Sequence, residues 1–212
     1  MVFFSALTLQ GDIEPNRCRT VFYLLCLLTL LACLLSKNSF ASQYPAVIKA
    51  GDYFPDIPLS GSLSSNDEKY LGLLGRKAFS LSDIRAKVLW IEVFSIYCAI
   101  CQKQATKFNR LYELVQKDDF ISRNMKMIGI GTGNNNKEVA HFRKYYDVMF
   151  PLIADPDFKV HEALKKARTP LVILLDKRSG PYKILTILDP ARPTETLIED
   201  IRTELHKIKP VH

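Results

Sequence analysis

Apolar and polar residues follow two different periods along the chain, and these periods predict most of its secondary structure. Residues 87–94 are almost all apolar, which is typical of a strand in a sheet covered on both faces. From residue 98 to 117, apolar residues recur at spacings of four and three, which predicts a helix whose buried face consists of Cys101, Ala105, Phe108, Tyr112 and Val115. The same criteria predict strands at 125–131, 171–176 and 182–188, and helices at 137–146, from a cap at 155–157 to 166, and at 194–208. This order of elements indicates an α/β fold with a sheet of mixed strand direction.

The region before residue 80 has a weaker pattern. Residues 42–61 are expected to be an extended loop, because their prolines oppose helix formation. Residues 62–79 are polar with scattered leucine and glycine, and we expect a hairpin or a disordered loop there. A single turn of α- or 3₁₀-helix is expected at 81–84.

Residues 1–41 have the pattern of an export leader. Basic residues precede an uncharged stretch at 21–35, and Ser39-Phe40-Ala41 resembles a signal-peptidase site. The stretch is short for a spanning helix, which needs about 20 apolar residues. We therefore expect cleavage after this tripeptide and a mature domain over 42–212, exported to the periplasm. The alternatives are an uncleaved anchor that tethers the domain to the membrane facing the periplasm, or lipidation at Cys33.

Charge and composition limit the function only weakly. The chain has a net charge of +7 and is 48% hydrophobic, so it can bury a sizeable core. Arginine and lysine do not cluster among aromatic residues, and we therefore expect no nucleic-acid partner. A basic, solvated surface accounts for the charge, with an anionic membrane face or an acidic partner as the alternative.

Cys98 and Cys101 are the most informative residues of the predicted mature domain. They form a C-x-x-C directly after an apolar strand, where the start of a helix stabilises the thiolate of the first cysteine. A zinc site would need further ligands, and His141 and His161 do not have the required spacing. A structural disulfide this short would constrain the unfolded chain little. The spacing therefore favours dithiol–disulfide chemistry, with no metal and no cofactor other than the Cys98–Cys101 pair.

Glu92 is a carboxyl group within the apolar strand that precedes the cysteines. In a pleated strand it shares a face with Trp90 and Phe94. Burial there raises the pKa of a carboxyl group. Such a group can accept a proton from a thiol and return it later. The alternative is an ion pair between Glu92 and a lysine at a sheet edge.

Arg168-Thr169-Pro170 precedes the predicted strand at 171–176. Proline can open a strand but cannot occupy its middle. A cis Thr169–Pro170 bond would expose backbone beside the cysteines, where an extended substrate could pair. The alternative is an ordinary trans proline at the start of the strand.

Together these residues resemble the thioredoxin superfamily, over roughly residues 50–209. Glu92, Cys98, Cys101 and Pro170 fall on the buried acid, the two cysteines and the cis-proline of that superfamily. The long spacing between Cys98 and Pro170 is similar to the exported TlpA/ResA-type branch. This resemblance implies a three-layer α/β/α fold around a mixed central sheet, with an N-terminal extension and an inserted strand–helix element before the proline.

The resemblance also implies a mechanism. Cys98 would attack a substrate disulfide and Cys101 would resolve the mixed disulfide, while Tyr97, Ile100, Thr169 and Pro170 would contact the substrate. The implied partners are disulfide-containing exported proteins, among them apocytochrome c in cytochrome c maturation, and a membrane electron donor. The implied activity is a protein-disulfide reductase.

The active-site sequence departs from that branch in three ways. Tyr97 replaces the usual tryptophan, Ala99-Ile100 replaces a dipeptide that often contains proline, and Glu92 replaces the commoner aspartate. The dipeptide between the cysteines tunes the thiol pKa and the reduction potential, so the direction of electron flow stays open.

Two other functions remain as alternatives. A peroxiredoxin-like thiol peroxidase would use the Ser95-x-x-Cys98 pattern with Arg168 as its activating arginine, although Ile91 stands where its proline is expected. A non-enzymatic Cu(I) or assembly chaperone would bind copper through the two thiolates, with His161 or Met149 as a third ligand.

Overall fold

The computed structural model describes residues 26–27, 48–61, 63–76, 78–178 and 180–208. The chain divides into two units, residues 1–43 and 44–212. In the first unit the two described residues are helical. The expected cleavage site after Ala41 and the alternative lipidation site at Cys33 lie outside the described residues. Among the helices that are described, none combines the length and the apolar character needed to cross a bilayer.

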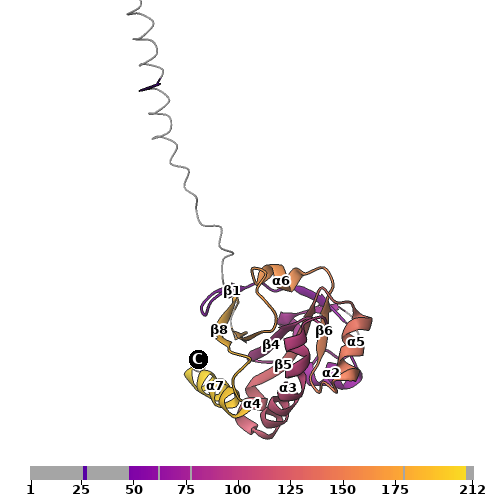
Figure 1. Cartoon of the computed structure of the whole chain (residues 1–212). Helices are drawn as coiled ribbons and strands as arrows, with labels where there is room; N and C mark the ends of the chain where they lie inside the picture. The colour runs from indigo at the N-terminus through magenta and orange to yellow at the C-terminus, as the bar shows by residue number, and fades with distance from the viewer. Residues whose placement is uncertain (1–25, 28–47, 62, 77, 179, 209–212) are drawn as a thin grey trace, which may run out of the picture. The chain divides into compact units, whose positions relative to one another are not determined.

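The second unit is built on a six-stranded mixed sheet, which Figure 1 shows. Its strands are β1 (Tyr53–Phe54), β4 (Val88–Phe94), β5 (Met125–Thr132), β6 (Leu152–Asp155), β7 (Leu171–Asp176) and β8 (Tyr182–Leu188). They lie in the order β1-β8-β7-β4-β5-β6. β4 is parallel to β5 and antiparallel to β7. The cysteine-bearing loop therefore leaves the middle of the sheet.

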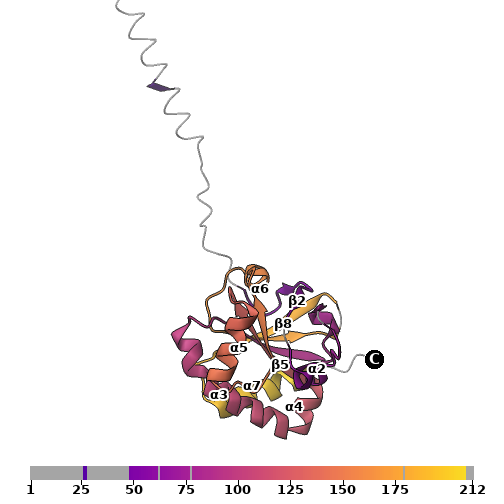
Figure 2. The same ribbon diagram turned by 90° about the vertical axis from the view of Figure 1, so that its right-hand side faces the viewer.

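Helices and a small hairpin cover the two faces of this sheet. The helices are α2 (Ser65–Leu71), α3 (Ala99–Lys117), α4 (Asp119–Asn124), α5 (Asn136–Tyr145), α6 (Lys159–Ala163) and α7 (Thr194–Lys207), with a 3₁₀ turn, η1, at Leu81–Asp83. The hairpin pairs β2 (Pro58–Ser60) with β3 (Ala78–Ser80). Figure 2 shows α3, α5 and α7 on one side of the sheet and α6 with β2 on the other.

Strand β4 contributes to both apolar layers because all seven of its residues are buried. Trp90 and Phe94 pack among the side chains of α3, α5 and α7, whereas Ile91 and Val93 pack on the opposite side. Burying each such side chain stabilises the fold by about 1.5–3 kcal/mol. The apolar run at 88–94 is therefore continuous because β4 is covered on both faces of the sheet, as the pattern predicted. The predicted fold class, a mixed sheet between layers of helices, is confirmed.

Helix α3 buries the face that its sequence period predicts, with one difference. Cys101, Ala105 and Phe108 are buried, but Leu111 is fully buried where Tyr112 was expected. Tyr112 is only partly buried and packs at the edge of the same cluster. The helix ends at Lys117, because the Asp118 side chain accepts hydrogen bonds from the first backbone N–H groups of α4.

The expectation of a hairpin or a disordered loop at 62–79 is wrong, because helix α2 lies in this segment. The Ser64 hydroxyl accepts a hydrogen bond from the Asp67 N–H, and the Asp67 carboxylate accepts one from the Ser64 N–H, which is a capping box. The Asp67 carboxylate also forms a buried ion pair with Arg143 of α5. Leu71 and Leu73 are completely buried. These tertiary contacts make the short helix stable despite its polar sequence.

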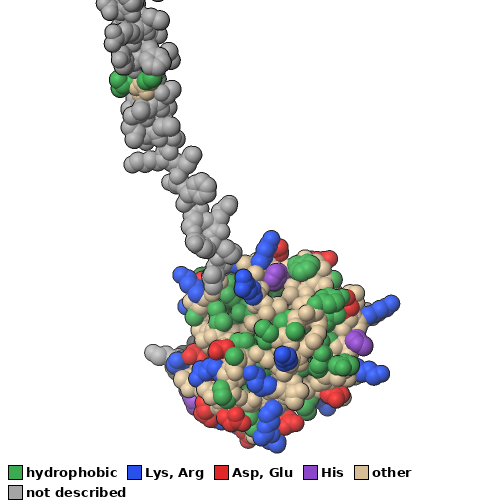
Figure 3. Space-filling model, viewed as in Figure 1, with side chains coloured by type: hydrophobic (Ala, Val, Ile, Leu, Met, Phe, Trp, Pro, Cys, Tyr) green, Lys and Arg blue, Asp and Glu red, His purple; other side chains and the backbone are tan. Residues whose placement is uncertain are grey.

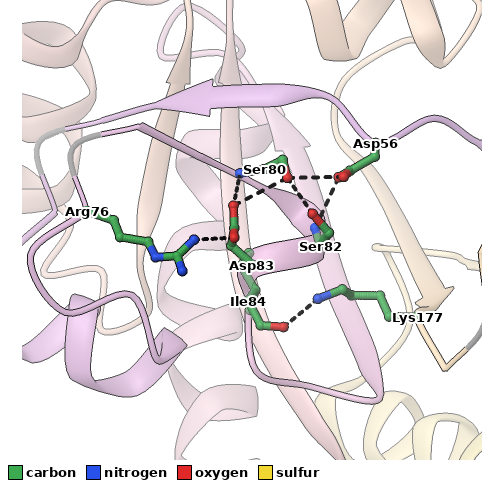
Figure 4. A network of polar contacts seen from close by, with 7 residues as sticks. All are labelled: Asp56, Arg76, Ser80, Ser82, Asp83, Ile84 and Lys177. Atoms are coloured by element: carbon green, nitrogen blue, oxygen red, sulfur yellow. Dashed lines mark hydrogen bonds and ion pairs between the residues drawn. The ribbon is translucent and has the colours of Figure 1, made fainter.

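A polar network links the hairpin to the end of β7, as Figure 4 shows. Asp56 accepts hydrogen bonds from the Ser80 hydroxyl at 3.1 Å and the Ser82 N–H at 3.0 Å. Asp83 accepts one from the Ser80 N–H at 2.8 Å. The Lys177 ammonium donates to the Ile84 carbonyl. The Lys177–Ile84 hydrogen bond thereby connects the β2–β3 hairpin and η1 to the end of β7 in the main sheet.

Two elements between α5 and β7 differ from the sequence expectation. The apolar pattern did not predict β6, which pairs with β5, because its four residues give too short a pattern. The helix expected to reach residue 166 ends at Ala163, and Lys165 and Lys166 then adopt positive φ angles of 55° and 57°. Asp155 does cap this helix, since its carboxylate accepts hydrogen bonds from the first N–H groups of α6. β6 lies between α5 and α6, in the region between Cys98 and Pro170 where the resemblance implied an inserted strand–helix element.

Candidate functional site

The two cysteines form a disulfide at the start of α3. Their Cα atoms are 5.2 Å apart. Cys98 is the N-cap of the helix and is partly exposed, whereas Cys101 is completely buried. The Cys101 N–H donates a hydrogen bond to the Cys98 sulfur at 3.2 Å. A thiolate on Cys98 would be stabilised by this donor and by the helix dipole.

Asn134 and Gln102 hold the loop that carries Cys98, and the sequence did not single them out for this role. The Asn134 side-chain oxygen accepts a hydrogen bond from the Ile96 N–H at 3.0 Å, and the Gln102 amide donates to the Ile96 carbonyl at 2.7 Å. Asn134 is completely buried. It lies in the β5–α5 connection, whose run of asparagines indicated only helix capping. The contact with Ile96 is visible only once β4 and β5 are paired.

Glu92 lies inside the protein, on the face of β4 that α3 covers. It is 4% exposed and shares its side of the strand with Trp90 and Phe94, which belong to the same apolar cluster as Cys101. Burial raises the pKa of the Glu92 carboxyl group to about 8. This value is close to that of an ordinary thiol. A solvent-exposed ion pair at a sheet edge, the alternative, does not fit this position.

Thr169 and Pro170 lie beside the cysteines, at the start of β7. The peptide bond between them is cis. The Thr169 carbonyl oxygen is 3.7 Å from the Cys98 sulfur. Both residues are partly buried. Backbone that directly precedes β7 therefore lies beside the Cys98 sulfur.

Tyr97 and Ile100 form an exposed apolar rim around Cys98, with 73% and 57% of their surfaces accessible. The Tyr97 hydroxyl donates a hydrogen bond to Glu138 at 2.6 Å. This bond raises the pKa of Tyr97 and lowers the pKa of Glu138. Glu138 also accepts from the Asn135 N–H in the capping box of α5. The rim is thus attached to the start of α5.

Histidines and carboxylates do not gather around the sulfurs. Among the described residues there is no group of three or more Cys, His, Asp or Glu side chains that could bind a metal ion. The His161 Nε2 atom lies 3.1 Å from the Ala167 carbonyl oxygen. Because that carbonyl can only accept, Nε2 donates, and this nitrogen is occupied.

A family model provides an independent classification of the chain. Residues 50–192 match the model of the AhpC/TSA family. The chain belongs to this family. The matched residues include Glu92, both cysteines and Pro170, so the match covers the whole candidate site.

Three proteins to which the chain is similar are named for disulfide or peroxide chemistry. The thiol-disulfide oxidoreductase ResA of Geobacillus thermodenitrificans is 28% identical over 192 residues, which cover 91% of this chain and 95% of the relative. A secreted thiol-disulfide isomerase from Corynebacterium glutamicum superposes with a TM-score of 0.54 at 18% identity, covering 72% of this chain and 85% of that one. A peroxidoxin from Mycobacterium tuberculosis superposes with a TM-score of 0.53 at 16% identity, covering 77% and 99%. The two structural likenesses show a shared fold only.

This AhpC/TSA protein is a thioredoxin-superfamily thiol–disulfide oxidoreductase of the TlpA/ResA type, as the cysteine pair, the fold and the named relatives together indicate. Its substrates are accordingly disulfide-containing proteins in general. The fold alone does not separate this class from peroxidases, because the peroxidoxin shares it. What distinguishes this chain as a thiol–disulfide oxidoreductase is a second cysteine, three residues after the first and bonded to it at the start of one helix.

Proposed function

We propose that the protein is an exported disulfide reductase that acts on other exported proteins, through Cys98 as nucleophile and Cys101 as resolving residue. The observation that carries this proposal is the unequal burial of the two sulfurs. Cys98 is partly exposed between the apolar rim and the Thr169 carbonyl, while Cys101 is completely buried behind it. A substrate sulfur can therefore reach Cys98 but not Cys101.

The proposed reaction transfers two electrons to the substrate. The Cys98 thiolate attacks one sulfur of a substrate disulfide, which breaks the substrate S–S bond and forms a mixed disulfide, and the first substrate sulfur leaves as a thiolate. Glu92 accepts the proton of the Cys101 thiol, and the Cys101 thiolate attacks the Cys98 sulfur. The second substrate sulfur then leaves and takes up a proton. The substrate gains two thiols and the enzyme retains the disulfide.

Export is the proposed location because the proposed substrates contain disulfides, and protein disulfides persist mainly outside the cytosol. It is supported by the leader-like pattern of residues 1–41 and by a structural relative described as secreted. In such a compartment the oxidised enzyme must be reduced again, and a membrane-bound dithiol donor is the proposed source of electrons. Apocytochrome c is the proposed substrate only to the extent that the resemblance to the TlpA/ResA branch implies it.

Trapping the mixed disulfide tests the mechanism. The Cys101→Ala variant, expressed in the cell and quenched with acid, is expected to accumulate mixed disulfides on Cys98 that a reducing agent dissolves. Cys98→Ala is the matched control, because the remaining thiol is buried and is expected to trap nothing. Absence of adducts on the Cys101→Ala variant would overturn the exchange mechanism. Faster consumption of hydrogen peroxide than reduction of insulin by the purified wild type would favour the peroxidase alternative.

A further inference from the structure

A pocket opens close to Cys98 of the active-site disulfide. Its volume is about 440 Å³, and Ser95 and Thr169 form part of its wall. Both residues contact Cys98: the Cys98 N–H donates to the Ser95 carbonyl at 3.0 Å, and the Cys98 sulfur lies 3.7 Å from the Thr169 carbonyl. A chain joined to Cys98 therefore places its neighbouring side chains at the mouth of this pocket.

Two basic side chains from the segment after α6 line the pocket, Lys166 and Arg168. Lys166 forms an ion pair with Glu162 at 3.2 Å, but both side chains are more than half exposed, so water weakens the pair. Within the described residues, no carboxylate lies at ion-pair distance from Arg168. The pocket consequently has an excess of positive charge. Figure 3 shows Lys and Arg side chains projecting from the surface around α6.

A buried hydroxyl group at the pocket wall lacks a hydrogen-bond partner. Thr132, the last residue of β5, is 6% exposed, and within the described residues its Oγ1 atom has no partner. Buried hydroxyls in native proteins are nearly always hydrogen-bonded, so the Thr132 hydroxyl has a hydrogen bond to offer to a water molecule or to a ligand atom. A hydroxyl can donate to a carboxylate oxygen as readily as to a neutral one. This observation is independent of the positive charge.

Phe158 and His161 give the pocket one apolar and rigid side. Phe158 is 46% exposed and has a positive φ of 58°, and its ring lies near that of His161. The His161 ring is held by its hydrogen bond to the Ala167 carbonyl. Ala167 directly precedes Arg168, so this bond also positions the basic segment. The pocket combines a short apolar wall with cationic groups and one free hydroxyl.

We propose that this pocket binds an acidic side chain of the substrate protein, close in sequence to the cysteine that bonds to Cys98. This inference rests on the proposed function, because it assigns a substrate preference to the same site. The carboxylate lies between the Arg168 guanidinium and the Thr132 hydroxyl, Lys166 adds positive charge, and the methylene groups of the acidic side chain contact Phe158. The enzyme therefore selects disulfides that have a glutamate or aspartate nearby.

Peptide disulfides that differ in one residue test the preference. Three peptides with one internal disulfide are compared, which have Glu, Gln or Lys beside one cysteine. For each peptide, the rate of reduction by the reduced wild-type protein is divided by the rate of reduction by dithiothreitol. This division removes the effect of the charge on the peptide thiols themselves. The Glu peptide is expected to react about fivefold faster than the Gln peptide at low ionic strength, and the Lys peptide more slowly. The advantage is expected to shrink as salt is added.

Variants locate the effect. Lys166→Gln combined with Arg168→Gln is expected to bring the Glu/Gln rate ratio close to one, Arg168→Glu to invert it, and Thr132→Val to lower it without a change of charge. Arg123→Gln is the matched control, because Arg123 is an exposed arginine on α4, beyond the far end of α3, and the ratio is expected to stay as in the wild type. An equal Glu/Gln ratio in the wild type and the double variant would overturn the proposal. Failure of the wild type to reduce any of the peptides would instead overturn the proposed function.

Discussion

The sulfur of Cys98 lies 3.7 Å from the carbonyl oxygen of Thr169, although the two residues are far apart in the sequence. Cys98 is the N-cap of α3 and follows the central strand β4, and Thr169 lies two residues before the neighbouring antiparallel strand, β7. The pairing of β4 with β7 brings the Cys98 sulfur and the backbone at Thr169 next to each other. A substrate segment can therefore pair with backbone while its disulfide meets the sulfur.

The first prediction concerns the pH dependence of stability. Burial raises the pKa of Glu92 to about 8, from about 4.3 in an unfolded chain. Between these values the folded state retains a proton that the unfolded state releases, so the free energy of unfolding falls as pH rises from about 4.5 to 8. The loss is on the order of a few kcal/mol. Glu92→Gln does not titrate, and its stability relative to the wild type is expected to increase across this range.

Urea unfolding of the oxidised proteins at pH 5, 6, 7 and 8 measures this difference. Glu113→Gln is the matched control, because Glu113 is an exposed glutamate on α3. The difference between that variant and the wild type is expected to stay nearly constant. A constant difference for Glu92→Gln would show that Glu92 is not a buried titrating group.

The second prediction concerns the resolution step. If Glu92 accepts the proton of Cys101, then Glu92→Gln is expected to prolong the life of the mixed disulfide by roughly 100-fold or more, the usual contribution of a general base. Rapid acid quenching followed by alkylation and mass analysis separates the mixed disulfide from the resolved enzyme. The pH dependence of resolution near pH 8 is expected to weaken in the variant. A mixed disulfide as short-lived as that of the wild type would exclude this role.

The third prediction concerns the support of the active-site loop. Asn134→Ala removes the acceptor of the Ile96 N–H, which is expected to cost about 1–3 kcal/mol of unfolding free energy and to shift the reduction potential of the cysteine pair. Asn135→Ala is the matched comparison, because it removes the cap of α5, at a cost of about 1 kcal/mol, without a contact to the loop. Equilibration with glutathione buffers measures the potential. Equal potentials for the two variants would contradict a positioning role of Asn134.

The fourth prediction concerns the exposed rim. Tyr97→Ala and Ile100→Ala are expected to lower kcat/KM for a protein disulfide such as insulin while changing the rate with a small disulfide much less, because the small reagent does not contact the rim. Tyr97→Phe keeps the ring and loses only the hydrogen bond to Glu138, so it is expected to fall between Tyr97→Ala and the wild type. An equal loss with both substrates would mean that these residues act on Cys98 itself rather than on substrate binding.

Several features of the site could be predicted from local sequence. The apolar run of β4, the position of Glu92 on the α3 side and the start of a helix at Cys98 follow from side-chain alternation and helix period, which depend on near neighbours in the chain. Helix α2 and strand β6 could not be predicted in this way. The first is held by the ion pair between Asp67 and Arg143, and the second by pairing with β5.

The sequence by itself determined the chemistry of this protein: two cysteines three residues apart after an apolar strand, with a carboxyl group inside that strand. Only the tertiary structure decided which groups surround the sulfur. Thr169 meets Cys98 through strand pairing, Asn134 meets Ile96 through the β5–α5 connection, and Thr132 lines a pocket with residues that follow α6. The physical reason is that periodicity reports how a residue faces its own element, whereas contacts between distant segments depend on the packing of the complete sheet.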